Sequence, residues 1–92
     1  MAKARARIIV SGFVQGVFFR YNTCNQAERL NITGWVKNRW DGKVEVLLEG
    51  EKEDAERLIA WCHQGPPGAQ VNKVEVKWEE YKGEFNSFSI AW

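Results

Sequence analysis

The stretch ITGWVKNRWDGKVEVLLE, residues 32–49, decides the fold. Residues 32–38 are rich in β-branched and aromatic types, and apolar residues fall on every second position of 43–49, which is typical of β-strands. Asp41 and Gly42 stand between the two segments and form a residue pair that tight hairpin turns prefer. The sequence therefore predicts two antiparallel strands joined by a hairpin.

Two helices and three more strands are predicted around this hairpin. Residues 4–10 alternate small or apolar residues with Arg5 and Arg7, which indicates a strand whose arginines line a solvated face. Apolar residues spaced i, i+3, i+4 and i+7 within residues 51–63 indicate a helix, which the following Gly-Pro-Pro sequence ends. The remaining predicted elements are a short helix over 22–30, a strand over 74–78 and a short last strand over 88–92.

The order β-α-β-β-α-β, with a terminal strand added, predicts the fold class. It is the split βαβ arrangement, an α+β fold in which two helices cover one face of an antiparallel sheet. A chain of 92 residues is long enough for one domain and too short for two, so we expect a single domain over residues 1–92. With 45% hydrophobic residues the chain can build a core of its own, and we expect most of its five tryptophans there.

Composition excludes several classes of function. The formal net charge of +1 lacks the basic excess that nucleic-acid binding usually needs, so no nucleic-acid partner is expected. No apolar run approaches the length of a membrane span, and the N-terminal MAKARARIIV does not have the pattern of a signal peptide. We therefore expect a monomeric, cytoplasmic protein without a membrane partner.

The cysteines and the histidine do not indicate a metal site. Cys24 and Cys62 are far apart in the sequence, and a cytosolic chain with its own core favours buried thiols over a disulfide, although a bridge stays open. His63 follows Cys62 directly, which is not the spacing of zinc ligands, so we expect it on the surface. No metal and no cofactor is predicted.

The segment from Gly12 to Arg20 is a candidate phosphate-binding loop. It leaves the first predicted strand, carries Gly12 and Gly16, and runs into a helix. Backbone N–H groups near a helix N-terminus lack internal partners and attract anions, and an arginine fork can hold two phosphoryl oxygens at once. The alternative is that the glycines only turn the chain and that Arg20 is a surface arginine.

Asn38 is the second candidate, at the end of the first hairpin strand. This strand end can approach the loop after residues 4–10 if the two strands lie in one sheet, and the Asn38 amide can then hold a water near a bound phosphoryl group. The alternative is an ordinary turn asparagine whose side chain bonds to its own backbone.

These two segments resemble the signatures of the acylphosphatase family. The sequence reads GFVQGVFFR over residues 12–20 and GWVKNRWDGKVE over 34–45, which match the family patterns GxVQGVxFR and GWVxNxxDGxVE at every defining position. Phe18 stands where many members have glycine, and its backbone amide is still available. The resemblance implies a ferredoxin-like fold and a hydrolase that is independent of metals.

The same resemblance implies the roles of the site residues and the ligands. Arg20 and Asn38 would be catalytic, with Arg20 binding the phosphoryl group and Asn38 orienting the attacking water. The substrate would be a small acyl phosphate, and inorganic phosphate would be the product and a competitive inhibitor. The backbone amides that would bind phosphate belong to Gln15, Gly16, Val17, Phe18, Phe19 and Arg20.

Other phosphoryl-transfer designs and RNA binding do not match the sequence. Cys24 and Arg29 do not have the C-x5-R spacing of cysteine phosphatases, and Gly16 is not followed by the Gly-Lys-Ser/Thr of a P-loop. Residues 43–49 contain no aromatic residue of the kind with which RNA-binding sheets stack bases. A catalytically silent phosphate-binding or interaction module of the same fold stays open as the alternative.

Overall fold

A computed structural model gives the structure of the chain and describes residues 2–92. Its seven elements follow the predicted order. They are β1 (Lys3–Phe13), α1 (Phe19–Arg29), β2 (Thr33–Asn38), β3 (Val44–Glu51), α2 (Lys52–Gln64), β4 (Gln70–Glu79) and β5 (Phe88–Ile90).

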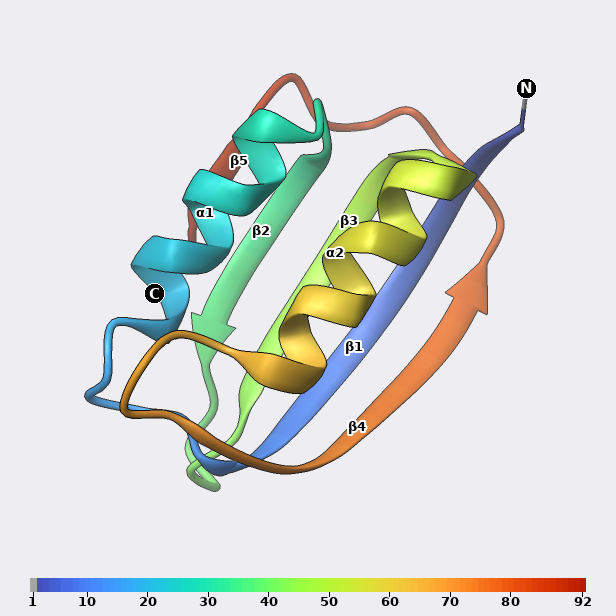
Figure 1. Cartoon of the computed structure of the whole chain (residues 1–92). Coiled ribbons are helices and arrows are strands. Elements are labelled where there is room, and N and C mark those ends of the chain that lie inside the picture. Colours follow the sequence, from blue (N-terminus) through green and yellow to red (C-terminus); the bar gives the residue numbers. More distant parts are fainter. Residues whose placement is uncertain (1) are drawn as a thin grey trace.

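The strands form one sheet in the order β4-β1-β3-β2-β5. Strand β1 pairs antiparallel with β3 and β4, and β2 pairs antiparallel with β3, as the hairpin signal predicts. Both helices lie on one face of this sheet (Figure 1). The added strand β5 pairs parallel with β2, which makes the sheet mixed. The predicted α+β fold with a short additional C-terminal strand is confirmed.

The core lies between the helices and the inward face of the central strands. Ile8 and Val10 of β1 and Val46 of β3 are fully buried because alternate residues of a strand share one face. Leu58 and Cys62 of α2 are one turn apart and cover them from above.

Several element boundaries differ from the sequence prediction, and two of them bear on the candidate site. Strand β1 continues to Phe13 through a register shift between Ser11 and Gly12. A side chain at Gly12 would place its Cβ 2.1 Å from the carbonyl oxygen of Gln70, so this glycine permits strand pairing and does not begin the loop. Helix α1 begins at Phe19 instead of residue 22, which places Arg20 in its first turn.

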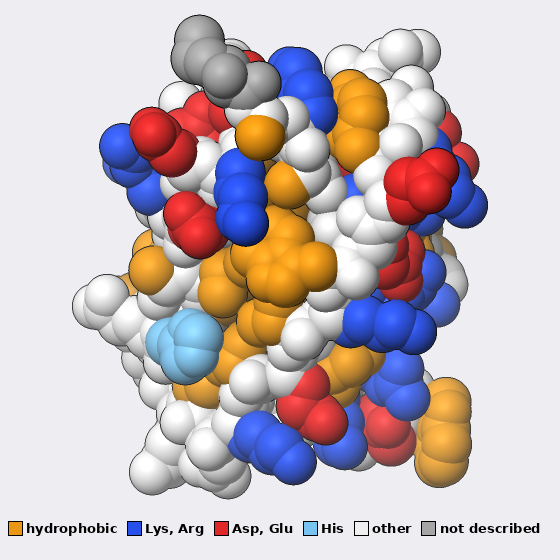
Figure 2. All heavy atoms as spheres, turned by 90° about the vertical axis from the view of Figure 1, so that its right-hand side faces the viewer, with side chains coloured by type: hydrophobic (Ala, Val, Ile, Leu, Met, Phe, Trp, Pro, Cys, Tyr) orange, Lys and Arg blue, Asp and Glu red, His pale blue; other side chains and the backbone are white. Residues whose placement is uncertain are grey.

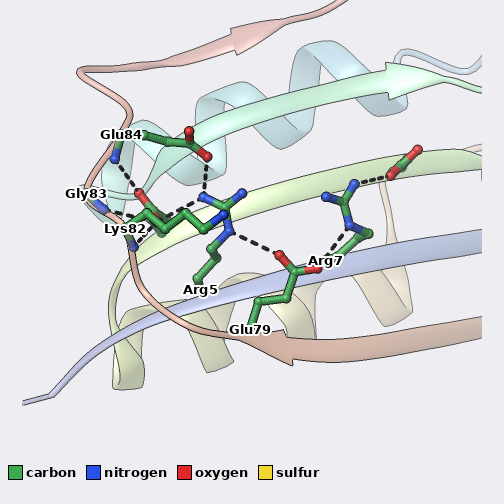
Figure 3. A network of polar contacts seen from close by, with 8 residues as sticks. Arg5, Arg7, Glu79, Lys82, Gly83 and Glu84 are labelled. Carbon is green, nitrogen blue, oxygen red and sulfur yellow. Dashed lines mark hydrogen bonds and ion pairs between the residues drawn. The ribbon is translucent and has the colours of Figure 1, made fainter.

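The expected solvated arginine face is wrong for Arg5, which is only 5% exposed. The connection between β4 and β5 lies against the sheet face opposite the helices and covers it (Figure 3). Arg5 pairs there with Glu49 and Glu79, at 3.1 Å each, and with Glu84. Alternation along β1 shows only which residues share a face of the strand. It cannot predict that residues 80–87, which come from the other end of the chain, cover Arg5.

The expectation that most tryptophans lie in the core is also wrong. Trp40 and Trp92 are 95% and 93% exposed, and Trp78 on the edge strand β4 is 43% exposed. Trp35 and Trp61 are half-buried. Figure 2 shows hydrophobic side chains gathered on the side of the molecule where β4 lies.

No helix within residues 2–92 has the length and apolarity needed to cross a bilayer.

Candidate active site

The topology brings the ends of three strands and the start of a helix to one place. Strands β1 and β2 both run antiparallel to β3, so they are parallel to each other, and β5 is parallel to β2. Their carboxyl ends therefore lie at the same end of the sheet, beside the N-terminus of α1 (Figure 1). A cavity of about 220 Å³ opens there. Its lining residues are Val14, Gly16, Phe18, Phe19, Arg20, Tyr21, Asn38 and Ile90.

The loop before α1 and the first turn of that helix line this cavity. Phe18 precedes the helix in a left-handed conformation with φ of 63°, and no side chain caps the helix. The first N–H groups of a helix have no partners within it and carry the positive end of its dipole. The first turn of α1 contains no acidic residue that would neutralise them. This helix start is suited to an anion.

Gly16 is needed in the loop for its backbone conformation. Its φ is 76°, and a Cβ built on it would meet no atom within 4 Å. The position is therefore open, and a larger residue would be strained by the dihedral angle alone. The loop can thus turn its backbone toward the cavity.

The guanidinium of Arg20 is free of acidic partners. Within residues 2–92 its side chain makes neither an ion pair nor a hydrogen bond, and its guanidinium lies over the Trp92 ring, with Cζ 4.7 Å from the ring centroid. All of its N–H donors are available for a ligand. Arg20 thus lines a cavity at the start of a helix with its donors unpaired.

Asn38 is the last residue of β2 and lines the same cavity as Arg20. Its side-chain amide has no hydrogen-bond partner in the described part of the chain. The side chain that bonds to the backbone of the hairpin turn is that of Asp41, whose Oδ1 accepts a hydrogen bond from the Lys43 N–H at 3.2 Å. Hydrogen bonds from the Arg39 side chain lower the pKa of Asp41 below its usual value. Asn38 therefore keeps its amide free for a ligand or a water.

The side chain of Gln15 has a role that sequence reasoning missed. Its Nε2 donates hydrogen bonds to the carbonyl oxygens of Arg39, at 2.8 Å, and Lys43, at 2.9 Å. These two carbonyls belong to the hairpin turn, so Gln15 ties the loop to the hairpin. Nothing in the sequence pattern indicates this contact, because its partners are backbone atoms more than twenty residues away.

Five of the seven predicted site residues line the cavity, together with residues that were not predicted. Gly16, Phe18, Phe19, Arg20 and Asn38 line it, whereas Gln15 turns to the hairpin and Val17 packs against the core. Sequence reasoning missed Ile90 and Trp92, because it did not predict that β5 runs parallel to β2. Tyr21, a lining residue, follows Arg20 directly and is 61% exposed.

Neither thiol is among the residues that line this cavity. Both cysteines are free, so the disulfide alternative is wrong. Burial raises the pKa of Cys62 to about 12, and burial together with the Glu28 charge raises the pKa of half-buried Cys24.

His63 is exposed, as expected. Residues 2–92 contain no cluster of three or more side chains that could hold a metal ion.

Comparisons with known proteins identify the family. The family model described as acylphosphatase matches residues 6–90. The chain belongs to the acylphosphatase family. It is 54% identical to an acylphosphatase from Pelotomaculum thermopropionicum over 99% of both chains, and 56% identical to one from Pyrobaculum calidifontis over 94% of this chain and 79% of the relative.

Solved structures of the family have the same fold. The crystal structure of acylphosphatase from Bacillus subtilis superimposes with a TM-score of 0.93 at 37% identity, covering 97% of this chain and 99% of the other. An acylphosphatase is a hydrolase. Membership of this family implies a small acyl phosphate as the substrate and inorganic phosphate as a product. This chain is an enzyme of that class.

Proposed function

We propose that the chain hydrolyses acyl phosphates by direct in-line attack of a water that Asn38 positions, on a phosphoryl group held by Arg20 and the loop amides. The single observation that carries the proposal is that the Arg20 and Asn38 side chains line one cavity with no hydrogen-bond or ion-pair partner among the described residues. One supplies positive charge and the other a polar amide. An anion and a water can therefore be held side by side.

Arg20 and the loop amides are suited to the phosphoryl oxygens. In phosphoryl transfer the protein mainly positions the groups and stabilises charge on the equatorial oxygens. The N–H groups at the start of α1 and the fork of Arg20 belong to residues that line the same cavity, and both are stronger donors to an anion than to a neutral ligand. The amides proposed to bind phosphate remain those of residues 15–20.

Asn38 is suited to the nucleophile. Its amide offers both a donor and an acceptor, so it can orient a water without itself becoming charged. No thiol, carboxylate or imidazole lines the cavity, which leaves no obvious side chain to form a covalent intermediate. We therefore place the water in line with the bond to the departing carboxylate. The phosphoryl oxygens themselves can accept the proton that the water loses.

A catalytically silent phosphate-binding or interaction module of the same fold is the competing function. Turnover separates the two: the purified chain is mixed with acetyl phosphate after treatment with EDTA, and the release of phosphate is followed. We expect rapid hydrolysis without added metal and competitive inhibition by inorganic phosphate. Phosphate binding without turnover would establish the silent module, and strict dependence on magnesium would contradict the proposed site.

The remaining expectations from the sequence are part of the proposal. We propose that the chain works as a monomer in the cytoplasm, with no cofactor and no nucleic-acid or membrane partner. The near-neutral net charge of +1 supports the lack of a nucleic-acid partner.

A further inference from the structure

The C-terminal residue reaches the candidate active site through the parallel pairing of β5. Val36 of β2 pairs with Ile90 of β5, and the N–H of Ala91 donates a hydrogen bond of 2.8 Å to the Val36 carbonyl oxygen. The ladder therefore continues beyond the end of β5 and fixes the backbone just before Trp92. Because Asn38 is two residues beyond Val36, Trp92 arrives at the same end of the sheet as Asn38.

Trp92 contacts Arg20 there through its ring face. The Arg20 Cζ lies 4.7 Å from the centroid of the Trp92 ring, within the range of a cation–π interaction. The Trp92 side chain is 93% exposed, so burial in the core does not explain its place. Trp40, at the tip of the neighbouring hairpin, is 95% exposed and makes no such contact in the described residues.

The contact with Trp92 leaves the donors of Arg20 unused, because the Arg20 side chain makes no hydrogen bond or ion pair within residues 2–92. Guanidinium N–H groups lie in the plane of the group and point out from its edge, whereas an aromatic ring occupies the face. An acidic partner would hold Arg20 by its donors and would compete with a phosphoryl group for them. Contact with the face of the Trp92 ring restricts the guanidinium without that competition.

We propose that Trp92 is a positioning residue that holds the Arg20 guanidinium with its N–H edge free for the phosphoryl group. The inference rests on the proposed function, because it assigns to Arg20 the binding of phosphate. Exposed cation–π pairs contribute modestly, so the expected effect on phosphate affinity is about two- to fivefold.

The test measures the dissociation constant of inorganic phosphate, which has no acyl group for the indole to contact. Trp92→Ala is expected to weaken phosphate binding by about two- to fivefold, with Trp92→Leu equal to it and Trp92→Phe close to the wild type. Trp40→Ala is the matched control and should leave the constant unchanged. Wild-type affinity in Trp92→Leu would show that an apolar contact suffices and would overturn the inference.

A double-mutant cycle links the effect to Arg20. In an Arg20→Gln background the same Trp92→Ala change is expected to have no further effect on phosphate binding, because the stacked cation is gone. An equal loss in both backgrounds would overturn the positioning role. If the wild type neither binds phosphate nor hydrolyses acetyl phosphate, the proposed function fails; if the wild type does both and Trp92→Ala binds phosphate equally well, only this inference fails.

Discussion

The Gln15 side-chain nitrogen lies 2.9 Å from the carbonyl oxygen of Lys43 and joins two segments separated by 28 positions. The same nitrogen lies 2.8 Å from the Arg39 carbonyl oxygen. The first segment leads into Arg20 and the second follows Asn38. The two side chains proposed to act on the substrate thus belong to segments that this one amide connects.

Replacing Gln15 by glutamate should uncouple the loop from the hairpin. The change keeps the shape of the side chain but turns a donor into an acceptor that faces two carbonyl oxygens. We expect a loss of about 1–3 kcal/mol in the free energy of unfolding, together with lower kcat/KM for acetyl phosphate. Denaturant titration and steady-state kinetics measure the two effects. Gln70→Glu, at an exposed position of β4, is the control, and equal behaviour of the two variants would refute the coupling.

Replacing Arg20 by glutamine should remove phosphate binding while the fold persists. Among the described residues Arg20 has no ion pair or hydrogen bond to lose, only its exposed contact with the Trp92 ring, so the unfolding transition should stay near that of the wild type. Hydrogen bonds to charged groups contribute about 1.5–3 kcal/mol, which corresponds to a loss of roughly tenfold to a hundredfold in phosphate affinity. Calorimetric titration with phosphate measures it. Arg29→Gln, in the last turn of the same helix, should bind phosphate normally; retained affinity in Arg20→Gln would remove Arg20 from the site.

Replacing Asn38 by alanine should separate catalysis from binding. If its amide orients water and does not hold phosphate, kcat should fall by roughly a hundredfold while the phosphate inhibition constant changes little. Initial-rate kinetics with phosphate as inhibitor give both values from one set of experiments. A parallel loss of phosphate affinity would mean that Asn38 grips the phosphoryl group, and unchanged kcat would exclude it from the mechanism.

Local patterns predicted the element order and the two candidate segments, and long-range contacts account for what they missed. Arg20 and Asn38 could be selected from motifs because each lies where a strand or loop ends. The burial of Arg5 could not be predicted from local patterns, because its partner Glu84 comes from the connection before β5. The place of Trp92 depends on parallel pairing between β2 and β5, and strand periodicity contains no information on that direction.

Glu49 should make the protein sensitive to acid. It is 1% exposed and accepts hydrogen bonds from the N–H groups of Lys82, Gly83 and Glu84 at 2.8–3.2 Å. Burial alone would raise the pKa of Glu49, but these N–H groups and the Arg5 guanidinium outweigh it and hold the pKa below its usual value. The resulting stability is present above pH of about 4.3, the value for an unfolded glutamate, and is lost as the pH falls through the lower folded pKa.

Glu49→Gln tests this linkage. It should cost about 1–3 kcal/mol in the free energy of unfolding at pH 7, and the difference from the wild type should shrink as the pH approaches 3. Urea titrations at several pH values measure it. Glu75→Gln is the control, because Glu75 is about half exposed and its ion pair with Lys73 is 3.8 Å long. A difference that stays constant with pH would show that the Glu49 charge does not contribute.

The range of bonds that the enzyme can break should follow from the side chains that line its cavity. No carboxyl, imidazole or ammonium group lines it, and the only hydroxyl group there is the Tyr21 phenol. A carboxylate leaves as a stable anion, because its conjugate acid has a pKa of roughly 4, whereas an alkoxide needs a proton from a general acid. We therefore expect rapid hydrolysis of benzoyl and acetyl phosphate, little turnover of sugar phosphates or phosphoserine, and a broad pH optimum. Tyr21→Phe should retain activity on acetyl phosphate. Comparable kcat/KM values for an alkyl phosphate and an acyl phosphate would reveal a general acid in the site, and loss of the alkyl activity in Tyr21→Phe would identify it.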